Sequence, residues 1–164
     1  MKKTIAAFLI FSIIMLSMIV LISGCSNARN EIYSDDVKIA QSESYHTTMW
    51  VPKHSDNKYS LTADTLTGLR TIWRYDAEDD EDVEMFYSLS VSNGGKAKLV
   101  LVTPDDEVII LSENTDNRTV SELESQIVSL KAGNNRIKIV GYDKVKFELK
   151  LNIEVGEFGT RERE

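Results

Sequence analysis

The chain has 164 residues, with 26 acidic and 19 basic side chains and a formal net charge of −7 at pH 7. An acidic surface repels phosphate groups, which argues against nucleic acid as a partner and against electrostatic binding to anionic lipids. The single cysteine excludes a disulfide within one copy of the chain.

The N-terminus has the order of features found in an export signal. Lys2 and Lys3 precede an apolar run over residues 5–22 that no charge interrupts, and Ser23, Gly24 and Cys25 follow at once. The lysines hold their end on the cytoplasmic side while the apolar run enters the bilayer. The motif Ile22-Ser23-Gly24-Cys25 resembles the lipobox of bacterial lipoprotein precursors, with Ile22 in place of the more usual Leu.

The lipobox resemblance implies diacylglycerol on the Cys25 sulfur and cleavage of the chain between Gly24 and Cys25. Two acyl chains give stable attachment, so the membrane is the expected partner through the lipid on Cys25. We therefore expect a signal peptide over 1–24 and a mature protein on the extracytoplasmic face of a bacterial cell membrane. A retained transmembrane helix and an ordinary secretory signal are the alternatives.

Residues 25–44 are predicted to form a lipidated, flexible tether. This segment is polar and mixed in charge, and its sizeable apolar residues are Ile32, Tyr33, Val37 and Ile39. Such a composition is typical of linkers, in which we expect one short helix near residues 35–41.

From residue 45 onward, apolar residues recur at every second position, which predicts β-strands. Residues 145–155 alternate apolar and polar over their whole length, and 83–91 do the same with Phe86 as an exception. Residues 96–103 and 107–112 are more uniformly apolar, as in strands that are buried on both faces. We expect one β-domain over 45–158, followed by a charged tail over 159–164.

Four short segments are predicted to be turns because they contain Gly, Pro, Asn or Asp: residues 93–95, 104–106, 133–135 and 142–144. The first is expected to close a hairpin between Val91 and Lys96. Short strands joined by such turns favour an all-β fold, an antiparallel sandwich or barrel.

Residues 127–139 add a resemblance to a known architecture. Their order Ile-Val-Ser-Leu-Lys-Ala-Gly-Asn-Asn-Arg-Ile-Lys-Ile is similar to a strand–turn–strand of jelly-roll domains in the galactose-binding-like and carbohydrate-binding-module group. The resemblance implies an antiparallel β-sandwich of jelly-roll type, with a glycan as a conceivable ligand.

The densest charge in the chain is a run of seven carboxylates within residues 76–84. Calcium takes oxygen ligands of this kind, and alternate residues of an extended loop face one side, so Asp76, Glu78, Asp80 and Asp82 are the candidate Ca²⁺ ligands. The spacing is not that of an EF-hand. The competing interpretation is a solvated loop between two strands.

Aromatic residues form the second candidate site. Trp50, Trp73 and Tyr75 could stack on sugar rings through their flat faces, whereas core packing is the competing interpretation. On a regular strand, Arg70 and Arg74 lie on the face opposite Trp73, where they either bind an anionic ligand or protect an edge strand.

No motif in the sequence predicts catalysis. His46 and His54 match no structural zinc spacing, and no nucleophile elbow or phosphate-binding loop is present. We therefore expect a non-catalytic module of the cell envelope that binds an unknown protein or glycan and needs no cofactor other than a possible Ca²⁺. The alternatives are a carbohydrate- or Ca²⁺-binding module, or a small hydrolase that uses two of the many carboxylates.

Overall fold

The computed structural model describes residues 29–115, 118–120 and 122–159, so the apolar run, the lipobox and residues 160–164 lie outside the described residues. Within that part of the chain no helix is long and apolar enough to cross a membrane. The predicted all-β, antiparallel fold is confirmed. The strands are β1 (Tyr45–Thr47), β2 (Trp50–Ser55), β3 (Lys58–Ala77), β4 (Glu81–Val91), β5 (Lys96–Val102), β6 (Val108–Asn114), β7 (Glu124–Leu130), β8 (Gly133–Ile153) and β9 (Glu157–Phe158).

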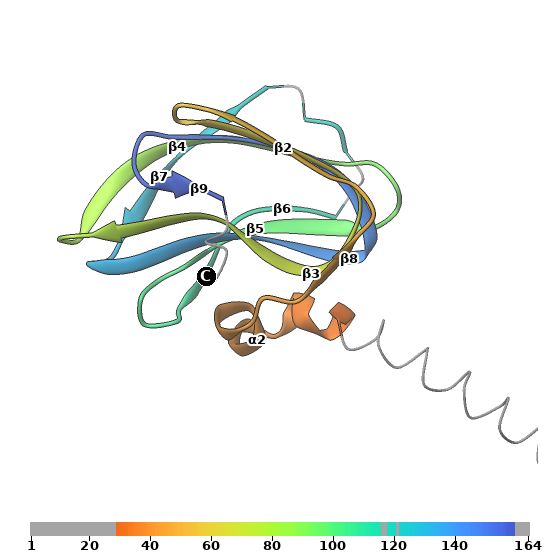
Figure 1. Cartoon of the computed structure of the whole chain (residues 1–164), viewed down its shortest axis with the longest axis horizontal. Helices are drawn as coiled ribbons and strands as arrows, with labels where there is room; N and C mark the ends of the chain where they lie inside the picture. Colours follow the sequence, from red (N-terminus) through yellow and green to blue (C-terminus); the bar gives the residue numbers. More distant parts are fainter. Residues whose placement is uncertain (1–28, 116–117, 121, 160–164) are drawn as a thin grey trace, which may run out of the picture.

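Two long strands, β3 and β8, pair along most of their length and take part in both layers of a sandwich (Figure 1). Layer A consists of β2, the first half of β3, the second half of β8, β4 and β7. Layer B consists of β1 and β9, the second half of β3, the first half of β8, β5 and β6. This order in the two layers is that of a jelly roll, as the resemblance implied.

The two long strands cross from one layer to the other at a shared bend. Their register passes from Leu66 opposite Val145 to Gly68 opposite Gly141, which leaves residues 142–144 of β8 without a partner in β3. Residues 143 and 144 have φ angles of 54° and 55°, and Gly68 has a φ of 100°. The predicted turn at 142–144 is therefore wrong, because these residues bend one strand and do not reverse the chain.

The other predicted turns have mixed outcomes. Residues 104–106 do connect the paired strands β5 and β6. The hairpin predicted at 93–95 is wrong, because β4 pairs with β7 and β8 in layer A while β5 pairs with β6 and β8 in layer B. Residues 133–135 are also no turn, since they pair with the last three residues of β3 as the start of β8.

The main core lies between the layers, as the alternation predicted. The apolar residues of β8 from Val145 to Ile153 are buried there, as are those of β4 from Val83 to Val91 with the exception of Phe86. Strand β5 is buried on both faces, but β6 is not. Ile110 of β6 is 52% exposed because β6 is an edge strand that pairs with β5 alone.

A second apolar cluster covers the outer face of layer B. It joins Leu69, Val100, Val102 and Val140 of the layer to Ile32, Tyr33, Ile39 and Ala40 of the N-terminal segment. We call residues 29–44 the strap; it contains η1 (Ile32–Ser34) and the predicted short helix, α2 (Asp36–Gln41). The prediction of a flexible tether is wrong for the strap, because its apolar side chains cover a sheet face that would otherwise meet water. Residues 25–28 lie outside the described residues.

Candidate functional site

Three carboxylates of the acidic run form hydrogen bonds with residues of β7, β8 and the segment between them. Asp76 accepts a hydrogen bond from Asn134 Nδ2 (2.8 Å), and Asp82 accepts one from Ser129 Oγ (2.6 Å). Asp80 accepts from the Ala132 amide (2.9 Å) and from Lys131 Nζ (3.3 Å), and these two contacts lower the pKa of its carboxyl. Asp80 therefore links the β3–β4 connection to the segment between β7 and β8, whereas Asp76 and Asp82 contact the residues opposite them in the paired strands.

The run does not converge on one point in the structure. Glu78 is exposed in the loop, and the described residues contain no group of three or more His, Cys, Asp or Glu side chains able to hold a metal ion. Calcium binding by Asp76, Glu78, Asp80 and Asp82 stays a prediction, with the structural role of three of these residues now visible.

The three aromatic candidates have different environments. Trp73 is fully buried in the main core, and its Nε1 donates to the Val155 carbonyl (2.8 Å). The prediction of Trp73 as a ligand-stacking residue is wrong, because a side chain without exposed surface cannot meet a sugar. Tyr75 lies half-buried beside it, with ring centroids 6.0 Å apart, and a hydrogen bond with Glu81 raises its pKa. Trp50 is half-buried at the open edge between the two layers.

Trp50 lies in an aromatic and cationic cluster at this edge. The Arg70 guanidinium carbon is 4.8 Å from the ring centroids of both Trp50 and Tyr45. A register shift between Thr71 and Trp73 puts Arg70 on the inward side, where a regular strand would point it outward. Arg74 keeps the predicted outward direction, with Nη2 3.8 Å from Glu43 Oε1.

Two hollows open at the same edge, on either side of Phe158. One has a volume of about 260 Å³ and is lined by Trp50, His54, Tyr59 and Arg70, among others. The second, of about 490 Å³, is lined by Arg74, Tyr75 and Asp76 together with the β9 segment. His54 and His46 are both exposed.

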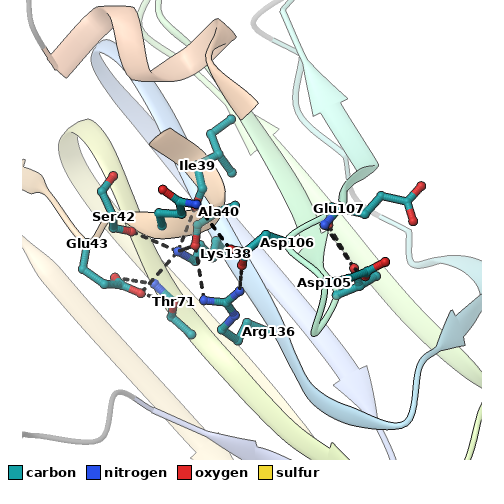
Figure 2. Close-up of polar contacts among 12 residues, drawn as sticks. Ile39, Ala40, Ser42, Glu43, Thr71, Asp105, Asp106, Glu107, Arg136 and Lys138 are labelled. Atoms are coloured by element: carbon teal, nitrogen blue, oxygen red, sulfur yellow. Dashed lines mark hydrogen bonds and ion pairs between the residues drawn. The ribbon is translucent and has the colours of Figure 1, made fainter. Parts of the chain in front are cut away.

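A cluster of buried polar contacts lies elsewhere, beneath the strap (Figure 2). Lys138 is 1% exposed, and its ammonium donates to the carbonyls of Ile39 (2.8 Å), Ala40 (3.1 Å) and Ser42 (2.9 Å). Arg136 adds a bond from Nη1 to the Ala40 carbonyl (3.2 Å). We call these contacts the lysine clasp.

Carboxylates complete the lysine clasp from two sides. Glu43 lies 3.7 Å from Lys138 Nζ and accepts hydrogen bonds from the amide and the hydroxyl of Thr71. Asp106 of the β5–β6 connection accepts from Arg136 Nη2 (2.7 Å). Burial lowers the pKa of Lys138 to about 8, which leaves the ammonium largely charged at neutral pH.

The lysine clasp is absent from the expectations drawn from sequence. Lys138 alternates with Ile137 and Ile139, so the pattern places it on a solvated face. The strap that buries it lies almost a hundred residues earlier in the chain, and no local signal links the two. The one hint was that Lys138 interrupts an otherwise apolar stretch.

Comparison with known proteins adds no identification: neither the protein-family models nor the curated proteins gave a match to the chain.

Proposed function

We propose that the mature protein is a lipid-anchored, extracytoplasmic β-sandwich that works as a non-catalytic binding or interaction module of the cell envelope. The observation that carries this proposal is the order of a basic start, an uninterrupted apolar run and Ile22-Ser23-Gly24-Cys25. A lone thiol at this position is explained by acylation, which also removes its liability to oxidation.

The docked strap supports the proposal by coupling the expected anchor to the domain. Cys25 precedes Arg29, the first described residue, by four positions, a span of at most about 14 Å when extended. Because the strap covers layer B, a lipid on Cys25 holds the sandwich close to the bilayer with layer B on the membrane side. The outer face of layer A then points away from the membrane, toward other components of the envelope.

Radioactive palmitate labelling of growing bacterial cells tests the anchor. Wild type is expected to take up label and fractionate with membranes, whereas Cys25→Ala takes up none and stays as the uncleaved precursor or is released. Ser26→Ala is the matched control, because it changes the next residue and leaves the lipobox intact. Equal labelling of Cys25→Ala and wild type would contradict lipidation at Cys25.

The hollow beside Trp50 favours a second candidate function, binding of a glycan. The hollow of about 260 Å³ is lined by the Trp50 ring, the Arg70 guanidinium and the Tyr59 side chain. A sugar ring in this hollow can both stack on an aromatic side chain and form hydrogen bonds. Calorimetric titration with purified envelope polysaccharides checks this role. Trp50→Ala is expected to weaken binding about tenfold, whereas Phe86→Ala on the outer face of layer A leaves it unchanged.

A further inference from the structure

The outer face of layer A carries a hollow that the functions above do not use. It has a volume of about 340 Å³ and is lined by Lys53, Lys58, Lys150 and Leu123, among others. Its lysines belong to β2, β3 and β8 of layer A. In Figure 1, layer A lies on the side of the sandwich opposite the strap. If the strap faces the membrane, as proposed above, this hollow faces the envelope.

Strand register brings the lysines to this face. Ser60 has Lys53 as its partner on one side and Lys150 on the other, and residues directly opposite one another share a face. Tyr59 and Leu151, the neighbours in sequence, are buried in the main core, so the lysines alternate outward. Lys53 and Lys150 are thus two strand spacings apart, about 10 Å, on either side of Ser60.

The three lysines of this face have no carboxylate partner. Within residues 29–115, 118–120 and 122–159, Lys38, Lys131, Lys138 and Lys146 form ion pairs with acidic side chains, whereas Lys53, Lys58 and Lys150 form none, as is also true of Lys96, Lys98 and Lys144. The nearest acid in the ladder on the same face is Glu148, which lies two positions before Lys150 on β8, so three lysines outnumber one carboxylate there. The charges of Lys53, Lys58 and Lys150 lie close together around the hollow, although the chain as a whole has a net charge of −7. The local electrostatic potential at the hollow therefore favours an anionic ligand.

The hollow also has an apolar component. Leu123 is 49% exposed at its rim, and the aliphatic stems of lysines supply further apolar surface. A phosphate or polyol polymer has no group that gains from contact with this surface. An acidic polypeptide does, because an apolar side chain can enter the hollow while neighbouring carboxylates meet the ammonium groups.

We propose that this hollow is a docking site for an acidic polypeptide segment of a partner protein, with one apolar side chain seated against Leu123 and its flanking carboxylates on Lys53, Lys58 and Lys150. The inference names the binding surface of the interaction module and rests on that proposed function. Binding itself requires no lipid, so the docking site and the anchor are tested separately.

Fluorescence anisotropy with the full chain in detergent provides the test. The probe is a short labelled peptide in which pairs of Glu alternate with single Leu; a second peptide has Gln for Glu, and a third has Ser for Leu. Wild type is expected to bind the first peptide best, and added salt is expected to weaken that binding. The charge-reversal variant Lys53→Glu/Lys150→Glu is expected to bind it at least tenfold more weakly.

The matched control is Lys144→Glu/Lys146→Glu, which changes the net charge equally at exposed positions outside the hollow. It is expected to keep the affinity of wild type within about twofold. Leu123→Ser is expected to reduce affinity for the Leu-bearing peptide severalfold and to leave the Ser-bearing peptide unaffected. Thermal melting confirms that each variant is folded.

Three results would overturn the docking site. The first is no binding of the acidic peptide by wild type, and the second is equal losses in the two charge-reversal variants. The third is binding of polyphosphate that is tighter than peptide binding and insensitive to Leu123→Ser, which would indicate a phosphate ligand. Palmitate labelling is independent of all three results, so the anchor can hold while the docking site fails.

Discussion

Lys138 is the residue on which the position of the strap depends. Its ammonium provides three hydrogen bonds to carbonyls at the end of α2 and just beyond it. Removing it deprives the Ile39 and Ser42 carbonyls of this donor, while the Ala40 carbonyl keeps its bond from Arg136. We expect Lys138→Met to lower the free energy of unfolding by about 2–4 kcal/mol. Urea denaturation monitored by far-UV circular dichroism measures the change.

Lys146→Met is the control for that loss. Lys146 forms an ion pair with Asp64 (2.9 Å) but is half exposed, so its removal should cost less than about 0.5 kcal/mol. Similar midpoints for Lys138→Met and Lys146→Met would show that the lysine clasp contributes little to stability.

Tyr59 makes the free energy of unfolding depend on pH, and comparison with Tyr59→Phe separates its effect from that of other residues. Its side chain is 5% exposed, and burial raises the pKa of its phenol to about 12. The folded state therefore holds this proton more tightly than the unfolded chain, and the resulting stability is lost as pH rises from about 10 to about 12. Over that window wild type is expected to lose about 2–3 kcal/mol relative to Tyr59→Phe. Other buried tyrosines are present in both proteins and cancel in the comparison; parallel pH curves would contradict the assignment.

The aromatic residues show where local sequence stops predicting a site. Trp50 and Trp73 are equivalent in the sequence, since each lies in a run with the composition of a strand. Trp73 lies where β8 pairs on one side and β9 on the other, and it is covered completely. Trp50 lies on β2 at the open edge and stays partly exposed. The number of neighbouring strands decides the difference, and that number depends on pairings far along the chain.

At the scale of the elements, alternation predicted the inner faces of β4 and of residues 145–153 of β8 correctly, because these segments face the core on one side only. Alternation could not predict that β8 continues as one strand through residues 142–144. Residues 142–144 carry turn signals, and two of them adopt positive φ angles, but the opposing strand bends at the same level and keeps the two halves of β8 in one ladder. Whether such a segment reverses or bends the chain depends on its partner strand, which is more than seventy residues away.

Gly141 tests the bend directly. A Cβ at this position would lie 2.7 Å from Leu66 Cγ and 2.9 Å from the Leu66 carbonyl oxygen, and both atoms are held by the core. Gly141→Ala is expected to lower the free energy of unfolding by about 2–3 kcal/mol through overpacking. Thermal melting and urea denaturation measure the loss.

Gly94→Ala is the matched control in the connection between the layers. Apart from its chain neighbours, no atom lies within 4 Å of the point where a Cβ would stand, so only its positive φ of 86° opposes the change, at a cost of about 1 kcal/mol. An equal effect of the two substitutions would show that Gly141 is not required by a close contact at the bend.

At the scale of the whole molecule, the strap turns an expected linker into a third layer. The jelly roll leaves the outer face of layer B apolar, and the segment that precedes the first strand covers it. The strap can form this third layer despite its polar composition, because only four of its side chains are buried against layer B: Ile32, Tyr33, Ile39 and Ala40. The strap could be recognised only once layer B had been assembled, which is why the sequence did not reveal it.

Under the proposed acylation of Cys25, the docked strap would set the distance between the sandwich and the membrane, which leads to the last prediction. With the strap docked, at most about 14 Å of chain separates Cys25 from the fold; with it released, the twenty residues from Cys25 to Tyr45 span up to about 70 Å. Glu107→Cys introduces a single labelling site on the mature, acylated protein, since Cys25 is the only native cysteine. Energy transfer from a dye at residue 107 to an acceptor lipid in liposomes measures the separation.

We expect efficient energy transfer in the protein that carries only Glu107→Cys. Adding Ile39→Asp is expected to decrease the transfer clearly, because a charge at this fully buried position removes the apolar contact of α2 with layer B and disfavours docking of the strap. Val37→Asp, at an exposed position of the same helix, is expected to leave the transfer unchanged. Equal transfer in all three proteins would mean that the strap does not control how far the sandwich stands from the bilayer.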